Sequence, residues 1–206
     1  MKNKILKMLE LQDAMNNRIN ADWRDAGNEW YRAIWIECAE MLDHYGWKWW
    51  KHQEPDMEQV ILEIVDIWHF VLSDLLESGS SVDDLAEGLV NDFQLSYEKL
   101  DIRLAIEALA RQTLDRKSAD VETFIKLMGT AGLTLDDLYR GYIGKNVLNF
   151  FRQDHGYKQG TYQKLWGGKE DNEYLVEAAA QMDTDSSTFQ QDLYNELKEH
   201  YTRLCS

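Results

Sequence analysis

Two pairs of acidic residues are the side chains in this sequence that are best suited to chemistry. They are Glu37 with Glu40 and Glu63 with Asp66. Acids three residues apart share one face of a helix, and the run 60–72 around the second pair is apolar nearly all the way round, which indicates a buried helix. Neither that run nor the run 33–42 contains a Lys or Arg. Ionised carboxylates in such surroundings are costly unless they are paired or bind a metal, so we expect the two helices to face each other with divalent cations between them.

Mg²⁺ is the cation that these side chains favour, because it prefers carboxylate oxygens and keeps waters that leave room for substrate phosphates. A structural role stays open, since acids three apart are common in a chain with 37 acidic residues. Asp66 and His69 resemble the carboxylate-x-x-His element of di-iron bundles, but such bundles need that element on two helices and Glu40 has no histidine three residues on. His69 lies on the same side of the helix as the acids. We expect His69 either to contact a ligand or to be a hydrogen-bonded histidine of the core.

Helices are expected to position these acids, because the chain has one proline and no alternating run bounded by hairpin turns. One helix begins at Lys4. Asp56 and Gln59 form a capping pair that begins another helix, which carries through to Glu77 and stops near Gly79. The other expected segments are a polar link at 22–28, a connector at 47–55, and helices at 29–45 (ending at Gly46), 82–94, 97–115, 119–129, from 135 onward and 187–204.

The net charge of −15 argues against nucleic-acid and anionic-membrane binding, since both need a basic surface. The N-terminal residues are broken by charges too often for a signal peptide, and no apolar stretch is long enough to span a bilayer. Cys38 and Cys205 do not make a disulfide framework, and Cys38 lies in an apolar run where we expect it to be buried. We therefore expect a cytoplasmic protein with a single domain over residues 1–206.

Two amides near the N-terminus are suited to recognising a base. Gln12 and Asn16 lie one turn apart on the first helix, and a paired set of amide donors and acceptors can read the edge of a pyrimidine. Surface polar residues would give the same pattern. The connector holds Trp47 with two more tryptophans and two lysines. These rings either stack on a base or clamp the loop.

A basic, glycine-rich stretch near the C-terminus is suited to binding phosphates. Six of the twelve glycines fall between 141 and 168, and bases outnumber acids there. Bases match phosphate charge, and glycines let the backbone close over a ligand. The segment from Lys145 to Asn172 is therefore interpreted as a mobile phosphate clamp, with an ordinary solvated loop as the alternative.

Several of these blocks together resemble a known family. The residues concerned are 11–16 (Leu-Gln-Asp-Ala-Met-Asn), 37–40 (Glu-Cys-Ala-Glu) with 47–51, 63–70, and 142–149 continuing to 168–172. They are similar to the dimeric, all-α dUTP diphosphatases (dUTPases) of the MazG-like pyrophosphatase superfamily. The acidic pairs alone would indicate only the superfamily, and the C-terminal block points to the dUTP branch. The likeness covers most of 9–76 and 139–175, whereas 80–135 matches poorly.

The resemblance implies a helical bundle of the all-α NTP pyrophosphatase type. It would contain metal-binding helices at about 29–77, a variable helical region at 80–135, and a Gly-rich, basic C-terminal phosphate-binding loop within 139–175. Two or three Mg²⁺ ions, for which Mn²⁺ could substitute, would be held by Glu37, Glu40, Glu63 and Asp66. A water activated by metal and carboxylate would attack in line, with Glu37 as the preferred base and Glu40 as the second choice.

The resemblance also implies substrate contacts and an assembly. Uracil would be held by Gln12, Asn16 and Trp47, with His69 near the deoxyribose. The terminal phosphates would be held by Lys145, Arg152, Tyr157, Lys164 and Lys169, with Asn172 nearby. The enzyme would convert dUTP, and dUDP as well, to dUMP with release of pyrophosphate or phosphate, and would form a homodimer. Two other functions stay open: a related pyrophosphohydrolase of another nucleotide, and a non-enzymatic, acidic helical interaction protein.

Overall fold

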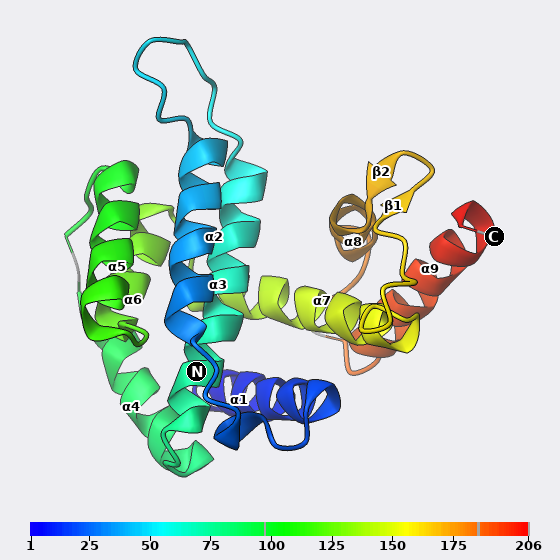
Figure 1. Cartoon of the computed structure of the whole chain (residues 1–206), viewed down its shortest axis with the longest axis horizontal. Helices are drawn as coiled ribbons and strands as arrows, with labels where there is room; N and C mark the ends of the chain where they lie inside the picture. The colour runs from blue at the N-terminus through cyan, green and yellow to red at the C-terminus, as the bar shows by residue number, and fades with distance from the viewer. Residues whose placement is uncertain (97, 185, 206) are drawn as a thin grey trace.

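The chain folds almost entirely into helices, which confirms the predicted all-α class. A computed structural model describes residues 1–96, 98–184 and 186–205. Its elements are α1 (Lys2–Ile19), a 3₁₀ turn η1 (Trp23–Asp25), α2 (Trp30–Tyr45), α3 (Met57–Glu77), α4 (Val82–Gln94), α5 (Ile102–Arg116), α6 (Val121–Thr130), α7 (Leu135–Asp154), β1 (Leu165–Trp166), β2 (Lys169–Glu170), α8 (Asp171–Ala179) and α9 (Phe189–Leu204). Helices α1 to α6 form a bundle, and α7 leads from it to a second lobe of β1, β2, α8 and α9 (Figure 1).

Helices α2 and α3 have the ends that the sequence predicts. Gly46 follows α2 with φ of 92°, a conformation that favours glycine over residues with a Cβ. Asp56 precedes α3, and its Oδ1 accepts a hydrogen bond from the backbone N–H of Gln59 at 3.2 Å. Gly79 comes shortly after the last residue of α3 and has φ of 79°. The two helices pack against each other and form the wall of the bundle that faces the second lobe.

The core of the bundle is built around α3, which is buried on most of its faces. Trp68 is fully buried, and its ring stacks on that of Phe124 with centroids 4.9 Å apart. Its Nε1 donates to Met8 Sδ at 3.3 Å. These contacts join α3 to α6 and α1. The variable region therefore closes the side of the bundle away from the second lobe, and α4 and α5 complete it by packing on α1 and α2.

Removal of the Trp68 ring should destabilise the bundle strongly. We expect Trp68→Ala to lower the free energy of unfolding by about 3–5 kcal/mol, because the helices around it cannot close the cavity that is left. Urea unfolding followed by circular dichroism measures this loss. Trp49→Ala is the matched control, since Trp49 is 89% exposed and its loss should change the free energy by less than about 0.5 kcal/mol. Equal losses in the two variants would contradict the central place of Trp68.

Helix α7 links the bundle to the second lobe. It begins at a capping box, in which the backbone N–H of Asp137 donates to Thr134 Oγ1 at 3.2 Å and that of Thr134 donates to Asp137 Oδ2 at 3.0 Å. Gly141 lies directly against α3, where a Cβ at residue 141 would be 2.8 Å from Val65 Cγ2. The C-terminal end of α7 inserts Phe151 among the aromatic rings of the second lobe.

The helix predicted from Leu135 onward is confirmed as α7, but the prediction of a mobile, glycine-rich loop from Lys145 to Asn172 is wrong for its first part. Helix α7 continues to Asp154 and carries both Lys145 and Arg152. Glycine inside a helix costs only about 1 kcal/mol, and Gly141 gives α7 its close approach to α3. Beyond Asp154 the stretch does contain turns, together with the short β1–β2 hairpin and α8. Its part in phosphate binding stays a prediction.

The predicted helix 97–115 begins later than expected. Residue 97 lies outside the described residues, and α5 begins at Ile102. Asp101 precedes it, and its Oδ1 accepts a hydrogen bond from the backbone N–H of Arg103 at 2.9 Å. The final amphipathic helix is confirmed as α9. None of the described helices is long and apolar enough to cross a membrane.

Candidate metal and nucleotide site

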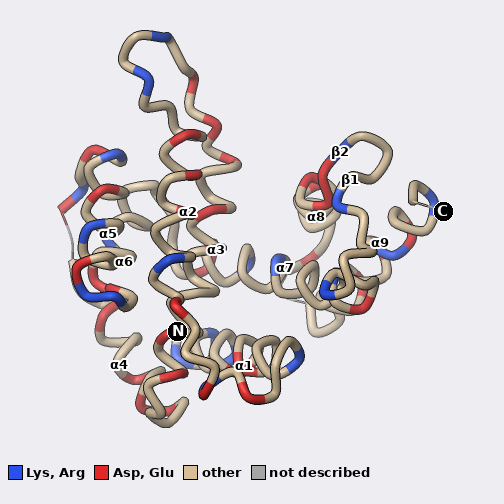
Figure 2. Tube along the Cα trace, in the orientation of Figure 1, with Lys and Arg blue, Asp and Glu red and all other residues tan. Residues whose placement is uncertain are grey.

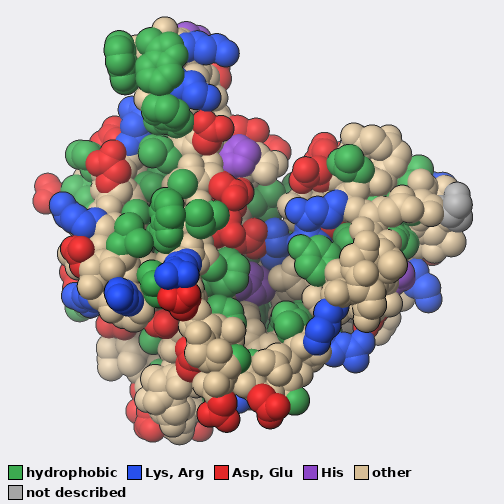
Figure 3. Space-filling view, viewed as in Figure 1, with side chains coloured by type: hydrophobic (Ala, Val, Ile, Leu, Met, Phe, Trp, Pro, Cys, Tyr) green, Lys and Arg blue, Asp and Glu red, His purple; other side chains and the backbone are tan. Residues whose placement is uncertain are grey.

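A cavity of about 990 Å³ lies between the helical bundle and the second lobe. One wall comes from α1, α2 and α3, and the other comes from α7, the segment 157–164 and the start of α8. Figure 3 shows the hollow between the two parts, with acidic side chains on the bundle facing basic ones on the second lobe. The cavity therefore combines an acidic wall and a basic wall.

Three of the four predicted metal ligands come together in this cavity. Oxygen atoms of Glu37, Glu63 and Asp66 lie within 4.8 Å of one another. Glu37 comes from α2 and the other two from α3, along which Figure 2 shows the acidic positions. Glu40 lines the same cavity but does not belong to this three-carboxylate cluster.

Burial and mutual repulsion raise the pKa of two of these acids. Burial, the hydrogen bond with Glu63 and the charges of the neighbouring acids together raise the pKa of Glu37 from its ordinary value of 4.5 to about 8, and burial has the largest effect. Burial also raises the pKa of Glu63, while the hydrogen bond from Glu37 acts in the opposite direction. A proton held between Glu37 and Glu63 therefore relieves the repulsion in the metal-free cluster.

The donor set of this cluster fits a hard divalent cation. All three groups offer carboxylate oxygens, which Mg²⁺ prefers. Lys145 Nζ lies 2.7 Å from Asp66 Oδ2, and His44 Nε2 lies 3.5 Å from Glu63 Oε1. The single positive charge of Lys145 does not balance three carboxylates. The cluster can therefore attract a metal cation.

At the other end of the cavity, α1 and α3 present a network of amide and hydroxyl groups. Gln12 Nε2 donates to Asn16 Oδ1 and to Ser73 Oγ, and Asn16 Nδ2 also donates to Ser73 Oγ, each at 3.0 Å. Gln12 Oε1 lies 2.7 Å from His69 Nδ1 and accepts from the Tyr142 hydroxyl at 3.1 Å. The predicted residues Gln12, Asn16 and His69 are thus brought together in the cavity wall, and they are hydrogen-bonded to one another.

The aromatic rings at this end are not the ones that the sequence indicated. Trp23, Trp30 and Phe70 line the cavity, and the rings of Trp30 and Phe70 stack with centroids 6.4 Å apart. The helical periodicity of the sequence could have identified Trp30 as a cavity residue. Trp30 precedes Glu37 by two helical turns, so the two side chains share a face of α2. The position of Trp23, in the turn after α1, carried no such signal.

Trp47 is not brought to the cavity within one chain. It lies in the connector beyond the end of α2, it is 44% exposed, and it is not among the residues that line the cavity. Its Nε1 donates to Asp43 Oδ1 at 2.9 Å, and its ring meets that of Trp50 edge to face at 5.2 Å. The connector tryptophans therefore contact one another outside the cavity.

A comparison with protein families shows which family the chain belongs to. The family model described as dUTPase matches residues 4–157, which is well over half of the 206 residues. The chain belongs to the dUTPase family. A search among curated proteins finds no match for it. This dUTPase is therefore an enzyme that hydrolyses dUTP, and dUTPases generally need a divalent metal, in agreement with its carboxylate cluster.

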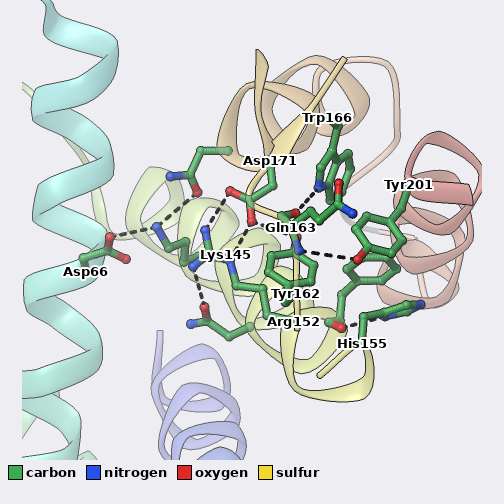
Figure 4. Close-up of polar contacts among 12 residues, drawn as sticks. Asp66, Lys145, Arg152, His155, Tyr162, Gln163, Trp166, Asp171 and Tyr201 are labelled. Carbon is green, nitrogen blue, oxygen red and sulfur yellow. Dashed lines mark hydrogen bonds and ion pairs between the residues drawn. The ribbon is translucent and has the colours of Figure 1, made fainter. Parts of the chain in front are cut away.

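The basic wall of the dUTPase is tied to the acidic wall by Lys145 (Figure 4). Its Nζ donates to Asp66 Oδ2 at 2.7 Å and to Asn172 Oδ1 at 3.2 Å. Its side chain is only 6% exposed. Lys145 is thus a buried ammonium group between a proposed metal ligand on α3 and the first turn of α8.

Arg152 is held in place by a carboxylate of the second lobe of the dUTPase. Its Nε and Nη2 donate to the two oxygens of Asp171, each at 2.8 Å, and the Tyr162 hydroxyl donates to Asp171 Oδ2 at 2.8 Å (Figure 4). This bidentate pair fixes the plane of the guanidinium group and leaves Nη1 directed toward Asn149 Oδ1 at 3.4 Å. No local pattern in the sequence indicates that Asp171 and Tyr162 support Arg152.

The remaining predicted phosphate ligands divide into two groups. Tyr157, Lys164 and Asn172 line the cavity of the dUTPase. Lys169 does not; it lies on β2, and its Nζ pairs with Glu177 at 2.6 Å. A role for Lys169 would require that exposed ion pair to break.

The raised pKa of Glu37 predicts a pH dependence of stability in the metal-free dUTPase. Because the folded pKa of about 8 lies above the ordinary 4.5, the folded state keeps a proton that the unfolded chain has released. This stabilising contribution is complete below about pH 4.5 and is lost as pH rises through about 8. Thermal unfolding in the presence of a chelator should therefore show a falling Tm over this range, with a shallower slope in Glu37→Gln. An unchanged slope in that variant would show that Glu37 is not the group responsible.

Proposed function

We propose that this dUTPase hydrolyses dUTP, and dUDP as well, in a Mg²⁺-dependent reaction that yields dUMP with release of pyrophosphate or phosphate. One observation carries the proposal: the carboxylate cluster lies in the same cavity as Lys145, Arg152 and the amide network. These groups match the parts of a nucleotide. Its anionic phosphate chain would lie next to the metal cluster and the basic side chains, and its base, which forms directional hydrogen bonds, would lie next to the amide network. The single-domain arrangement over residues 1–206 is part of this proposal, because both walls are needed for the cavity.

The metal would be held by Glu37, Glu63 and Asp66, with Glu40 as the fourth ligand once its side chain turns toward the cluster. Two or three Mg²⁺ ions, or Mn²⁺ in their place, would neutralise the charge of the phosphate chain and act as Lewis acids. Glu37 is the proposed general base and Glu40 the second choice. Glu37 can serve in both roles, because one carboxylate can bind a metal and accept a proton from the attacking water.

The phosphate chain would be held by side chains of the basic wall. They are Lys145, Arg152, Tyr157, Lys164 and Lys169, with Asn172 beside them. Lys145 supplies a point charge at the metal end, while the Asp171 pair keeps the guanidinium plane of Arg152 fixed. Fixed donors around the phosphates lower the entropic cost of bringing the chain into line for attack.

The nucleoside would occupy the end of the cavity next to Gln12, Asn16 and His69. Trp23 and Trp30 add flat apolar surface to this end, and their positions support a planar base there. Trp47 would reach the base only if the connector moved or if it came from a second copy of the chain. A close fit around the nucleoside would exclude the methyl group of thymine and the 2′-hydroxyl of ribose.

An assay of pyrophosphate release over a panel of dNTPs and NTPs, with phosphate release measured for dUDP, tests this proposal. We expect dUTP to be the preferred substrate, with no turnover after metal is removed by a chelator and recovery on addition of Mg²⁺ or Mn²⁺. A strong preference for another nucleotide would instead favour a related pyrophosphohydrolase with a different base pocket. Full activity in the chelator would contradict the metal site. We place the reaction in the cytoplasm, where free nucleotides are available.

We also propose that the protein is a homodimer. Large apolar side chains are exposed on neighbouring helices, namely Ile36 on α2, Ile61 on α3 and Leu104 on α5. Figure 3 shows apolar side chains gathered over this part of the bundle. Burial of such a surface by a second copy would remove it from water. Light scattering on the purified protein should give twice the mass of the chain, and a monomeric mass at micromolar concentration would contradict the dimer.

A further inference from the structure

The cavity-lining residues of α2 and α3 form two stripes that lie side by side along the acidic wall. On α2 the stripe runs from Trp30 to His44, and on α3 it runs from Gln59 to Ser73. At the rise of an α-helix, each stripe is roughly 21 Å long. The end of α2 meets the start of α3, because the backbone N–H of Asp56 donates to the His44 carbonyl oxygen at 3.0 Å (Figure 1). The wall therefore has two distinct ends.

Three kinds of groups follow one another along this wall. Trp30 and the amide network lie at one end, and the carboxylate cluster occupies the middle. Beyond the cluster, toward the connector, the lining residues are Glu40, His44 and Gln59. Gln59 precedes Glu63 by one helical turn, and His44 Nε2 lies 3.5 Å from Glu63 Oε1. His44 and Gln59 are thus next to the cluster, on the side away from the nucleoside end.

His44 and Gln59 bring hydrogen-bond donors to this end of the wall. An imidazole ring carries at least one N–H in either protonation state, and the glutamine amide carries two. The side chain of His44 is 37% exposed, and that of Gln59 is half-buried and lines the cavity. Glu40, the third lining residue there, offers only acceptors when it is ionised. An anionic oxygen placed beside the cluster at this end would meet donors from both helices.

We propose that His44 and Gln59 bind the terminal phosphate of dUTP, so that the cavity prefers a triphosphate chain over a diphosphate chain. This inference rests on the proposed function, in which the nucleoside lies at the amide network and the phosphate chain lies at the carboxylate cluster. A chain that begins at the nucleoside end and crosses the cluster reaches His44 and Gln59 with its last phosphate. The basic wall contacts the chain from the other side of the cavity, so these two residues add donors on the bundle side.

The length of the phosphate chain separates this role from two others. The diphosphate chain of dUDP is one phosphate shorter, so it ends at the cluster and gains little from the two donors. A His44 that only orients Glu63 would affect dUTP and dUDP equally, and its loss would weaken Mg²⁺ binding in the absence of nucleotide. A terminal phosphate that turned toward Arg152 instead would be insensitive to both His44 and Gln59.

Calorimetry with analogues that carry an imido bridge between the α- and β-phosphates measures this preference without turnover. In the presence of Mg²⁺, we expect wild-type protein to bind the dUTP analogue more tightly than the dUDP analogue. His44→Leu and Gln59→Leu should each lower the ratio of the two affinities roughly 10-fold, because each removes a hydrogen bond to a charged oxygen. His44→Gln keeps an N–H and should retain part of the preference.

His52→Leu is the matched control for these variants. His52 is exposed on the connector, pairs with Glu54 and is not among the residues that line the cavity. The ratio of affinities should be that of wild type in His52→Leu. Because neither His44 nor Gln59 is fully buried, all of the variants should keep the wild-type Tm to within a few degrees.

The outcomes distinguish this inference from the proposed function. A ratio of affinities that is unchanged in both His44→Leu and Gln59→Leu would overturn the inference, as would an equal loss for the two analogues. If wild-type protein hydrolyses dUTP in either case, only the inference fails. Wild-type protein that neither binds the analogues nor hydrolyses dUTP would instead contradict the proposed function, and the role of His44 and Gln59 with it.

Discussion

Glu63→Gln is expected to lower kcat/KM for dUTP roughly 1,000-fold or more. Glu63 belongs to the carboxylate cluster and shares a hydrogen bond with Glu37. Glutamine has nearly the same shape but no negative charge, so the proposed metal site loses a ligand while the packing of α3 is kept. Steady-state kinetics with dUTP and calorimetric titration with Mg²⁺ should both show the loss.

The matched control for this experiment is Glu58→Gln. Glu58 lies on the same helix, but it is exposed and is not among the residues that line the cavity. We expect wild-type kinetics from Glu58→Gln and an unchanged Tm for both variants in a chelator to within a few degrees. Activity within tenfold of wild type in Glu63→Gln would mean that the cluster is structural.

Lys145→Met is expected to reduce kcat/KM by about 100- to 1,000-fold. Methionine keeps most of the length and volume of lysine but removes the charge that lies 2.7 Å from Asp66 Oδ2. The proposed phosphate contact is then lost. In the nucleotide-free protein the same change should have the opposite effect on the metal, because the cluster loses its internal counter-charge and should bind Mg²⁺ more tightly.

Calorimetry on the nucleotide-free protein separates these two effects of Lys145. Lys198→Met is the control, since Lys198 is an exposed residue of α9 outside the cavity, and it should change neither catalysis nor Mg²⁺ affinity. Weaker Mg²⁺ binding in Lys145→Met would show that Lys145 supports the metal site rather than competing with it. Unchanged turnover of dUTP in Lys145→Met would show that Lys145 does not bind the phosphates.

The sequence predicted the bundle helices well where local signals and tertiary packing agree. Gly46 and Asp56 define the facing ends of α2 and α3 through backbone conformation and capping, which depend on a few neighbouring residues. The apolar run around Glu63 and Asp66 also predicted a buried helix correctly. The acids met in one cavity because helical spacing fixes the face from which each side chain projects.

The basic wall was predicted less well because composition does not report tertiary contacts. Glycines and bases suggested a loop at Lys145 and Arg152, but both residues lie on helix α7, which packs closely on Val65 of α3 at Gly141. The pairing of Arg152 with Asp171 joins α7 to the start of α8, and no local pattern encodes it.

The nucleoside end shows the same limit. Gln12 and Asn16 were identified by type and spacing, yet their use of each other and of Ser73 as partners follows from the packing of α1 on α3. The connector tryptophans were predicted to stack on a base or to clamp the loop only because the connector is rich in tryptophan. Trp23 and Trp30 line the cavity instead, from the turn after α1 and from the first turn of α2.

The most direct test of the account is the position of the metal. A crystal of the protein grown with Mn²⁺ and a non-hydrolysable dUTP analogue would locate the cation through its anomalous scattering. We predict density for Mn²⁺ bound by oxygens of Glu37, Glu63 and Asp66, with the phosphates of the analogue between the metal and Lys145. Manganese bound at another place in the protein, with these three carboxylates in contact only with one another and with Lys145, would contradict the assignment of this cavity as the active site.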